Sequence, residues 1–135
     1  MTEPRDGAPR REPPKPGRGP MPVVHLELHT ADGAGARAFY SELLGWRSHE
    51  LRHDAGAYVS LELGSVGGGV VECGTERALW LPYAEVADIV AATRHARRLG
   101  AEMLLEPREG PGGWRSVVRA PGCGEIALWE PKRGR

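Results

Sequence analysis

Apolar and polar side chains alternate along residues 23–29, where the polar positions are His25, Glu27 and His29. This period of two is typical of a strand with one face in a hydrophobic core and the other face in a polar environment. The pattern therefore predicts a half-buried strand whose three polar side chains share one face.

A helical pattern follows this strand between Asp32 and Gly45. Asp32 can cap the first turn of a helix, and Gly45 suits the left-handed conformation that often follows a last turn. The apolar residues between them recur at spacings of three and four: Ala36, Phe39, Tyr40, Leu43 and Leu44. We therefore expect an amphipathic helix after the first strand.

Three strand-like runs come next, at residues 46–51, 57–63 and 70–73. The glycines at 67–69 precede the third run, and we interpret them as a hairpin or a sharp turn. The same order of elements then returns. We expect a strand at 79–86, a helix from Asp88 to Gly100, strands at 103–105, 114–119 and 125–130, and a loop at 107–113.

This repeated order indicates an internal duplication. Asp88 lies 56 residues after Asp32, and the two caps precede their closing glycines by 12 and 13 residues. One such unit cannot cover both faces of its sheet, whereas two units can curve around a shared cavity. The predicted fold class is therefore α+β, with two βαβββ modules that form a curved mixed sheet around a cavity and carry their helices outside.

Composition divides the chain into three parts. Residues 1–21 are rich in proline and arginine and predict a disordered tail, and residues 132–135 form a short basic tail. Residues 22–131 are expected to form a single domain, with modules at about 22–75 and 78–131. The two cysteines, Cys73 and Cys123, are interpreted as buried or incidental thiols, with one disulfide bridge between them as the alternative.

Charge and hydropathy exclude several classes of function. The 18 basic and 18 acidic residues cancel, and the basic excess of the two tails leaves the central domain acidic. This balance favours neither nucleic-acid binding nor membrane binding. Because no long apolar run or secretory leader is recognisable, we expect a cytoplasmic protein.

Several short motifs accompany the duplication. His25 precedes Asp32 by seven residues, residues 38–40 read Ala-Phe-Tyr, and residues 43–46 read Leu-Leu-Gly-Trp. Residues 120–129 are similar to an Asp-Pro-x-Gly-Asn turn with its closing strand, although they depart from it at Ala120 and Cys123. With these motifs, residues 22–131 resemble the vicinal oxygen chelate superfamily, which groups glyoxalases, bleomycin resistance proteins and dioxygenases.

The resemblance implies where a metal would bind. Metal-dependent members take one ligand from each of four strands, and His25 and Glu72 occupy the first two of these positions. The other two positions hold Leu81 and Ala127, which cannot bind a metal. Because a catalytic metal site usually has three protein ligands, we expect no metal cofactor. The alternative is a divalent metal whose site is completed by His29 or Glu62.

The resemblance and the strand alternation together predict which side chains reach the cavity. The predicted ligand-binding residues are His25, His29, Tyr58, Ser60, Glu72, Leu81, Tyr83, Trp114, Ala127 and Trp129. An apolar and aromatic lining with a few polar groups suits a flat or amphipathic organic molecule. We therefore expect metal-independent binding of such a molecule, of which antibiotic sequestration is one form, and the resemblance also implies a homodimer.

Two other functions stay open. One is a glyoxalase-like or dioxygenase-like enzyme, a lyase, isomerase or cyclase, whose candidate catalytic residues are His25, Glu27 and Glu72. The other is an interaction module that binds a partner through the basic tail. The glycine-rich loop at 109–113 is expected to be a mobile cover over the cavity.

Overall fold

The computed structural model describes residues 20–53, 56–122 and 124–133. Most of the predicted tail at 1–21, together with Cys123 and residues 134–135, lies outside the described residues. The elements in chain order are β1 (Val23–Thr30), α1 (Gly33–Leu44), β2 (Ser48–His53), β3 (Gly56–Glu62), β4 (Gly67–Glu72), β5 (Leu79–Glu85), α2 (Ile89–Arg98), β6 (Glu102–Glu109), β7 (Gly113–Arg119) and β8 (Glu125–Pro131).

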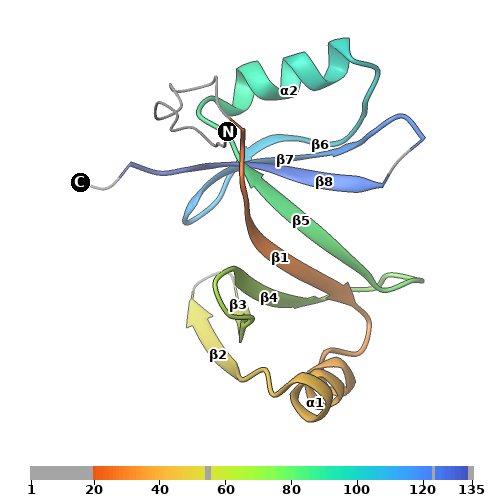
Figure 1. Cartoon of the computed structure of the whole chain (residues 1–135), viewed down its shortest axis with the longest axis vertical. Helices are drawn as coiled ribbons and strands as arrows, with labels where there is room; N and C mark the ends of the chain where they lie inside the picture. Colours follow the sequence, from red (N-terminus) through yellow and green to blue (C-terminus); the bar gives the residue numbers. More distant parts are fainter. Residues whose placement is uncertain (1–19, 54–55, 123, 134–135) are drawn as a thin grey trace, which may run out of the picture.

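All of these strands join one mixed sheet in the order β2-β3-β4-β1-β5-β8-β7-β6. The two halves of this order mirror each other, and Figure 1 shows them meeting where β1 runs beside β5. β1 and β5 pair antiparallel, while each of them pairs parallel with the last strand of its own half, β4 or β8. The predicted α+β fold of two βαβββ modules is confirmed.

The pairing of β1 with β5 locates the symmetry of the duplication. Leu26 lies opposite Pro82 in this pair, and these two residues are also 56 positions apart in the sequence. The pseudo-twofold axis that relates the modules therefore passes between them. Counting by the same 56 residues, Tyr83 occupies in the second module the place that Glu27 occupies in the first.

Both helices begin at the aspartates that the sequence marks. The side chain of Asp32 accepts a hydrogen bond from the backbone nitrogen of Gly35 at 2.9 Å, and Asp88 accepts one from Ala91 at 3.0 Å. Gly45, just after α1, has a φ of 73°, a left-handed conformation that glycine adopts without strain. Among the described residues, no helix is both long enough and apolar enough to cross a membrane.

The two helices pack very differently. α2 lies across β6, β7 and β8 (Figure 1). It buries its own residues Ile89 and Thr93. α1 packs mainly against β4 and leaves Phe39 and Leu43 56% and 61% exposed. Tyr40 nevertheless fixes α1 in place, because its hydroxyl accepts a hydrogen bond from the Trp80 indole at 3.3 Å. Much of the apolar face expected for the first helix is thus at the surface.

Gly67, Gly68 and Gly69 are strand residues of β4, so the expected hairpin or sharp turn at these glycines was wrong. The reason is a side chain from the neighbouring strand. A Cβ added at Gly69 would lie 1.7 Å from the Tyr58 hydroxyl oxygen, which is far too close for two atoms that are not bonded to each other. Glycine at this position therefore lets Tyr58 lie flat over β4 and reach β1.

Candidate functional site

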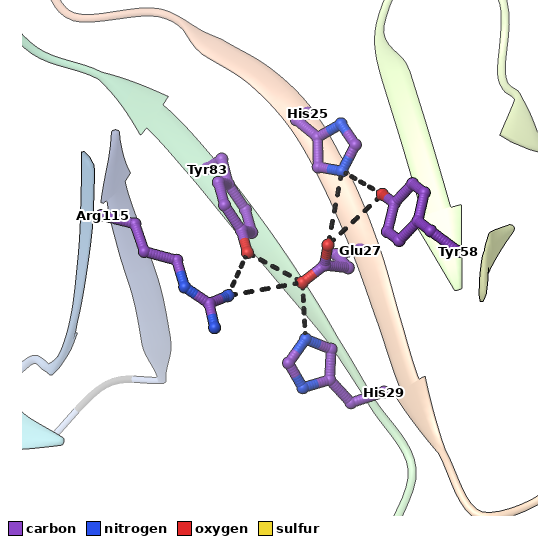
Figure 2. Close-up of polar contacts among 6 residues, drawn as sticks. All are labelled: His25, Glu27, His29, Tyr58, Tyr83 and Arg115. Carbon is purple, nitrogen blue, oxygen red and sulfur yellow. Dashed lines mark hydrogen bonds and ion pairs between the residues drawn. The ribbon is translucent and has the colours of Figure 1, made fainter. Parts of the chain in front are cut away.

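A buried carboxylate lies at the centre of the candidate site, on the inner face of the sheet. Glu27, in the middle of β1, is only 6% exposed. The other labelled side chains of Figure 2 lie around its carboxylate. Its Oε1 accepts a hydrogen bond from the Tyr83 hydroxyl at 2.8 Å and lies 2.8 Å from His29 Nε2. The guanidinium of Arg115 is 3.8 Å from the same oxygen and donates to the Tyr83 hydroxyl at 2.7 Å. Oε1 of Glu27 thus contacts residues of both modules.

The second oxygen of Glu27 faces the first module. Oε2 accepts a hydrogen bond from the Tyr58 hydroxyl at 3.3 Å and lies 3.7 Å from His25 Nε2. The His25 ring also lies 3.2 Å from the Tyr58 hydroxyl and packs edge-on against the Tyr83 ring. Alternation along β1 explains why His25, Glu27 and His29 share this face, as the sequence pattern predicts.

These contacts keep Glu27 ionised. Burial alone would raise the pKa of its carboxyl, but hydrogen bonds with His25, His29 and Tyr83 outweigh burial and hold the pKa well below its usual range. Burial and the nearby charge of Glu27 raise the pKa values of Tyr58 and Tyr83, so both hydroxyls stay protonated and can donate. Glu27 is therefore a fixed negative charge and a poor proton acceptor.

A cavity of about 580 Å³ opens beside this carboxylate. Glu27, His25, Tyr58 and Tyr83 form its polar floor, while Val24 and Trp129 form an apolar wall; residues 108–113, at the turn from β6 into β7, form its roof. This volume falls in the usual range for small-molecule sites. The arrangement suits a mainly apolar molecule that has a few polar groups.

The roof is tied to the chain that follows β8. The backbone nitrogen of Lys132 donates to the Gly112 carbonyl at 3.0 Å, and the Lys132 ammonium pairs with Glu109 at 2.9 Å. Gly110 and Gly113 are also joined by a backbone hydrogen bond of 2.7 Å. The loop expected at 107–113 is shorter than predicted, because β6 continues to Glu109.

Four of the predicted ligand-binding residues line the cavity: His25, Tyr58, Tyr83 and Trp129. His29 lies behind them, against Glu27. Leu81 and Ala127 are on the inner face as expected, but they are buried in a core cluster, with 2% and 0% exposure, and do not line the cavity. The inner face is therefore partly cavity and partly core.

Three other predicted positions lie elsewhere. The Ser60 hydroxyl donates to the backbone carbonyl of His49 on β2, and the Glu62 carboxylate contacts the His49 ring. Neither side chain reaches Glu27. Trp114 lies under the Lys132 ammonium, because its neighbour Arg115 takes the cavity side and successive strand residues face opposite ways.

Glu72 is not close to His25. In the pairing of β1 with β4, His25 lies opposite Gly67 whereas Glu72 lies opposite Thr30, about 16 Å further along the strands. Gly69, which pairs with Glu27, corresponds to Ala127, which pairs with Tyr83. The first-module position that corresponds to Ala127 is thus Gly69 rather than Glu72.

The residues present consequently do not fit the metal that the resemblance implies. Across residues 20–53, 56–122 and 124–133, no three His, Cys, Asp or Glu side chains are grouped to hold an ion. His25 and His29 both turn their Nε2 atoms toward Glu27, and the two remaining family positions are the apolar Leu81 and Ala127. We therefore derive no chemistry through a metal.

Sequence reasoning missed three cavity residues, Val24, Arg108 and Arg115. Val24 was placed on the opposite face from His25, but the pairing with β5 shifts register between Val23 and His25, so strict alternation fails there. Arg115 lies directly opposite Trp129 in the pairing of β7 with β8. A predicted strand pair with an inward Trp129 could have identified Arg115; Arg108 had no such signal, because its segment was expected to be a loop.

Comparisons with known proteins agree with this fold. The family model for the bleomycin resistance protein-like N-terminal region matches residues 23–64, which cover β1 to β3. No curated protein matches the sequence. A hypothetical protein from Bacillus halodurans has a similar structure, with a TM-score of 0.65 and 15% identity, over 84% of this chain and 96% of that one.

Two enzymes are also similar in structure. Methylmalonyl-CoA epimerase from Mycobacterium tuberculosis has a TM-score of 0.57 and 19% identity, over 82% of this chain and 88% of its own. The Streptomyces coelicolor epimerase, in complex with 2-nitronate-propionyl-CoA, has a TM-score of 0.58 and 16% identity, over 84% and 99%. At such identities the likeness concerns the fold. The chain thus has the fold that the vicinal oxygen chelate superfamily shares.

Proposed function

We propose that this protein binds a small, mainly apolar organic molecule in the cavity beside Glu27, without a metal and without changing the molecule chemically. Sequestration of an antibiotic is one form of this function. What supports the proposal is the state of Glu27: a carboxylate that four donor side chains surround beside an apolar wall. It can orient a bound molecule through the hydroxyls and rings it holds in place.

The same carboxylate argues against the enzymatic alternative. A general base works best when its pKa lies near the pH of the reaction, and the pKa of Glu27 is held well below that of an ordinary carboxyl. His25 and Glu72, the other candidate catalytic residues, lie far apart along β1 and β4. The geometry thus favours positioning and polar contacts over proton abstraction by Glu27.

A binding experiment tests the proposal directly. N-phenyl-1-naphthylamine is a neutral aromatic amine that fluoresces on entering an apolar site, and we expect saturable one-to-one binding to the full chain. A Val24→Trp variant would fill the cavity and should abolish this binding. Val23→Trp is the matched control, because Val23 is 47% exposed and does not line the cavity.

The fate of the ligand separates binding from catalysis. Mass spectrometry should recover the bound molecule unchanged after long incubation. Hemithioacetals, the substrates of glyoxalases, should likewise persist with and without added zinc, nickel or manganese. If the protein failed to bind the amine, or if it converted a hemithioacetal at a rate that His25→Ala abolished, the proposed function would be wrong.

A further inference from the structure

Two arginines share the inner face of the second module, directly opposite each other. Arg108 on β6 pairs with Arg115 on β7, and Arg115 pairs in turn with Trp129 on β8. All three residues line the cavity. Directly opposed residues on neighbouring antiparallel strands have Cβ atoms about 5 Å apart, and like charges at such positions repel each other. The cavity wall therefore concentrates positive charge beside an aromatic ring.

The charge of Arg115 is only partly compensated. Its Nη1 donates to Tyr83 and lies 3.8 Å from Glu27, while Nε and Nη2 have no hydrogen-bond partner among the described residues. A guanidinium has five N–H donors in a planar fork, which suits the two oxygens of an acidic group. Arg115 is held at one nitrogen and keeps the other two for a ligand.

Arg108 has no ion pair with any other residue in the described part of the chain. Its neighbour Glu109 does not compensate it, because the Glu109 carboxylate pairs with Lys132 at 2.9 Å. The negative charge of Glu27 is surrounded by its own donors. The cavity thus presents one unpaired cation and one half-paired cation to whatever enters it.

We infer that the cavity selects an amphipathic organic anion, whose acidic group lies between Arg108 and Arg115 and whose apolar body lies against Trp129 and Val24. This inference rests on the proposed binding function and names the class of its ligand. The acidic group can be a carboxylate, sulfonate or phosphate, because each offers the oxygens that a guanidinium fork binds. An anion between the two arginines reduces their mutual repulsion, and this reduction strengthens the binding.

A matched pair of dyes tests the inference. 8-Anilinonaphthalene-1-sulfonate differs from N-phenyl-1-naphthylamine by a single sulfonate, so the ratio of their Kd values isolates the contribution of the anion. We expect the anionic dye to bind about tenfold more tightly, which is the scale of a charge-assisted hydrogen bond. Arg108→Gln should remove most of this preference, so the ratio of the two Kd values should fall towards one.

Controls separate the cavity from the rest of the surface. Arg94→Gln makes the same change of charge on α2, outside the residues that line the cavity, and should leave the ratio of Kd values as in the wild type. Arg108→Lys keeps the charge without the fork and should retain part of the preference. Val24→Trp should block both dyes, which excludes binding of the anionic dye to the exposed apolar side chains of α1.

The two hypotheses fail in different ways. Absence of binding by both dyes would contradict the proposed function. Binding of the neutral amine with no preference for the sulfonate, or a preference that Arg108→Gln left intact, would overturn the selection for anions and leave the binding function standing. Where the preference for the sulfonate is found, displacement of the dye by benzoate and by phenyl phosphate ranks the acidic groups.

Discussion

The two modules share one backbone plan but carry opposite chemistry at equivalent positions. In the first module the inner positions of the central strand hold His25 and Glu27, and the 56-residue offset places Leu81 and Tyr83 at the corresponding positions of the second. At these positions the first module carries the charged Glu27, whereas the second carries the core residue Leu81 and the neutral hydroxyl of Tyr83. The comparison teaches that the cavity depends on divergence between the halves and not on their symmetry.

The largest effect is expected from removing the negative charge of Glu27, because the second module has the neutral Tyr83 at the corresponding position. Glu27→Gln keeps the shape of the side chain but places an amide nitrogen against donors, so we expect the free energy of unfolding to fall by about 2–3 kcal/mol. Urea unfolding at pH 7 measures it. Glu62→Gln, which disturbs an exposed contact with His49, should cost less than about 1 kcal/mol. Equal losses would show that Glu27 has no special role.

Acidification should weaken the same charge without mutation. The pKa of Glu27 in the folded chain lies below the ordinary 4.5, so the unfolded chain binds the proton more readily. The contribution of Glu27 to the free energy of unfolding is therefore fully present above about pH 4.5. This stability declines as the pH falls below about 4.5. Unfolding of wild type and Glu27→Gln, measured from pH 7 to pH 3, should therefore show a narrowing difference. A constant difference would contradict the lowered pKa.

A smaller effect is expected where the modules differ in side-chain volume. Gly69→Ala places a methyl group on the Tyr58 hydroxyl, so Tyr58 must leave Glu27, at a cost of about 1–2 kcal/mol. We also expect weaker binding of N-phenyl-1-naphthylamine. Gly74→Ala is the control, since a Cβ there meets nothing within 4 Å. Urea unfolding and dye titration measure the two effects. A Gly69→Ala protein with unchanged stability and unchanged dye affinity would show that Tyr58 can move away from Gly69 without loss.

The smallest effect concerns the helices. Leu43 on α1 is 61% exposed, so Leu43→Ser should change the free energy of unfolding by no more than about 0.5 kcal/mol. Ile89→Ala in α2 is the contrasting variant. Ile89 is 4% exposed, so its truncation leaves a cavity and should lower the free energy of unfolding by more than Leu43→Ser does. A loss with Leu43→Ser that grew with protein concentration would instead indicate that a second copy covers this face.

The fold was predictable from the sequence because its signals are local. Asp32 and Asp88 cap the helices by contacts with residues three positions away, and period-two alternation marks the strands. The glycines of β4 were misread because the side chains that lie against them come from outside β4: His25 at Gly67, Leu63 at Gly68 and Tyr58 at Gly69. Glycine composition alone cannot distinguish a turn from a strand that a neighbouring side chain covers.

The candidate site was predictable only in part, since it depends on strand register. Alternation correctly grouped His25, Glu27 and His29, and it placed Tyr58 and Tyr83 on the same face. It could not show that Glu72 lies about 16 Å from His25, because that separation follows from which residues of β4 pair with β1. The role of Arg108 could not be predicted for the same reason, because it depends on the pairing of Arg108 with Arg115.

The attachment of the cavity roof to Lys132 links ligand exchange to the solvent. Residues 108–113, which line the cavity, are joined to Lys132 by one backbone hydrogen bond and by the exposed ion pair between Lys132 and Glu109. Dissolved salt weakens exposed ion pairs. We therefore expect the residence time of a bound molecule to depend on ionic strength through the contact between Lys132 and Glu109.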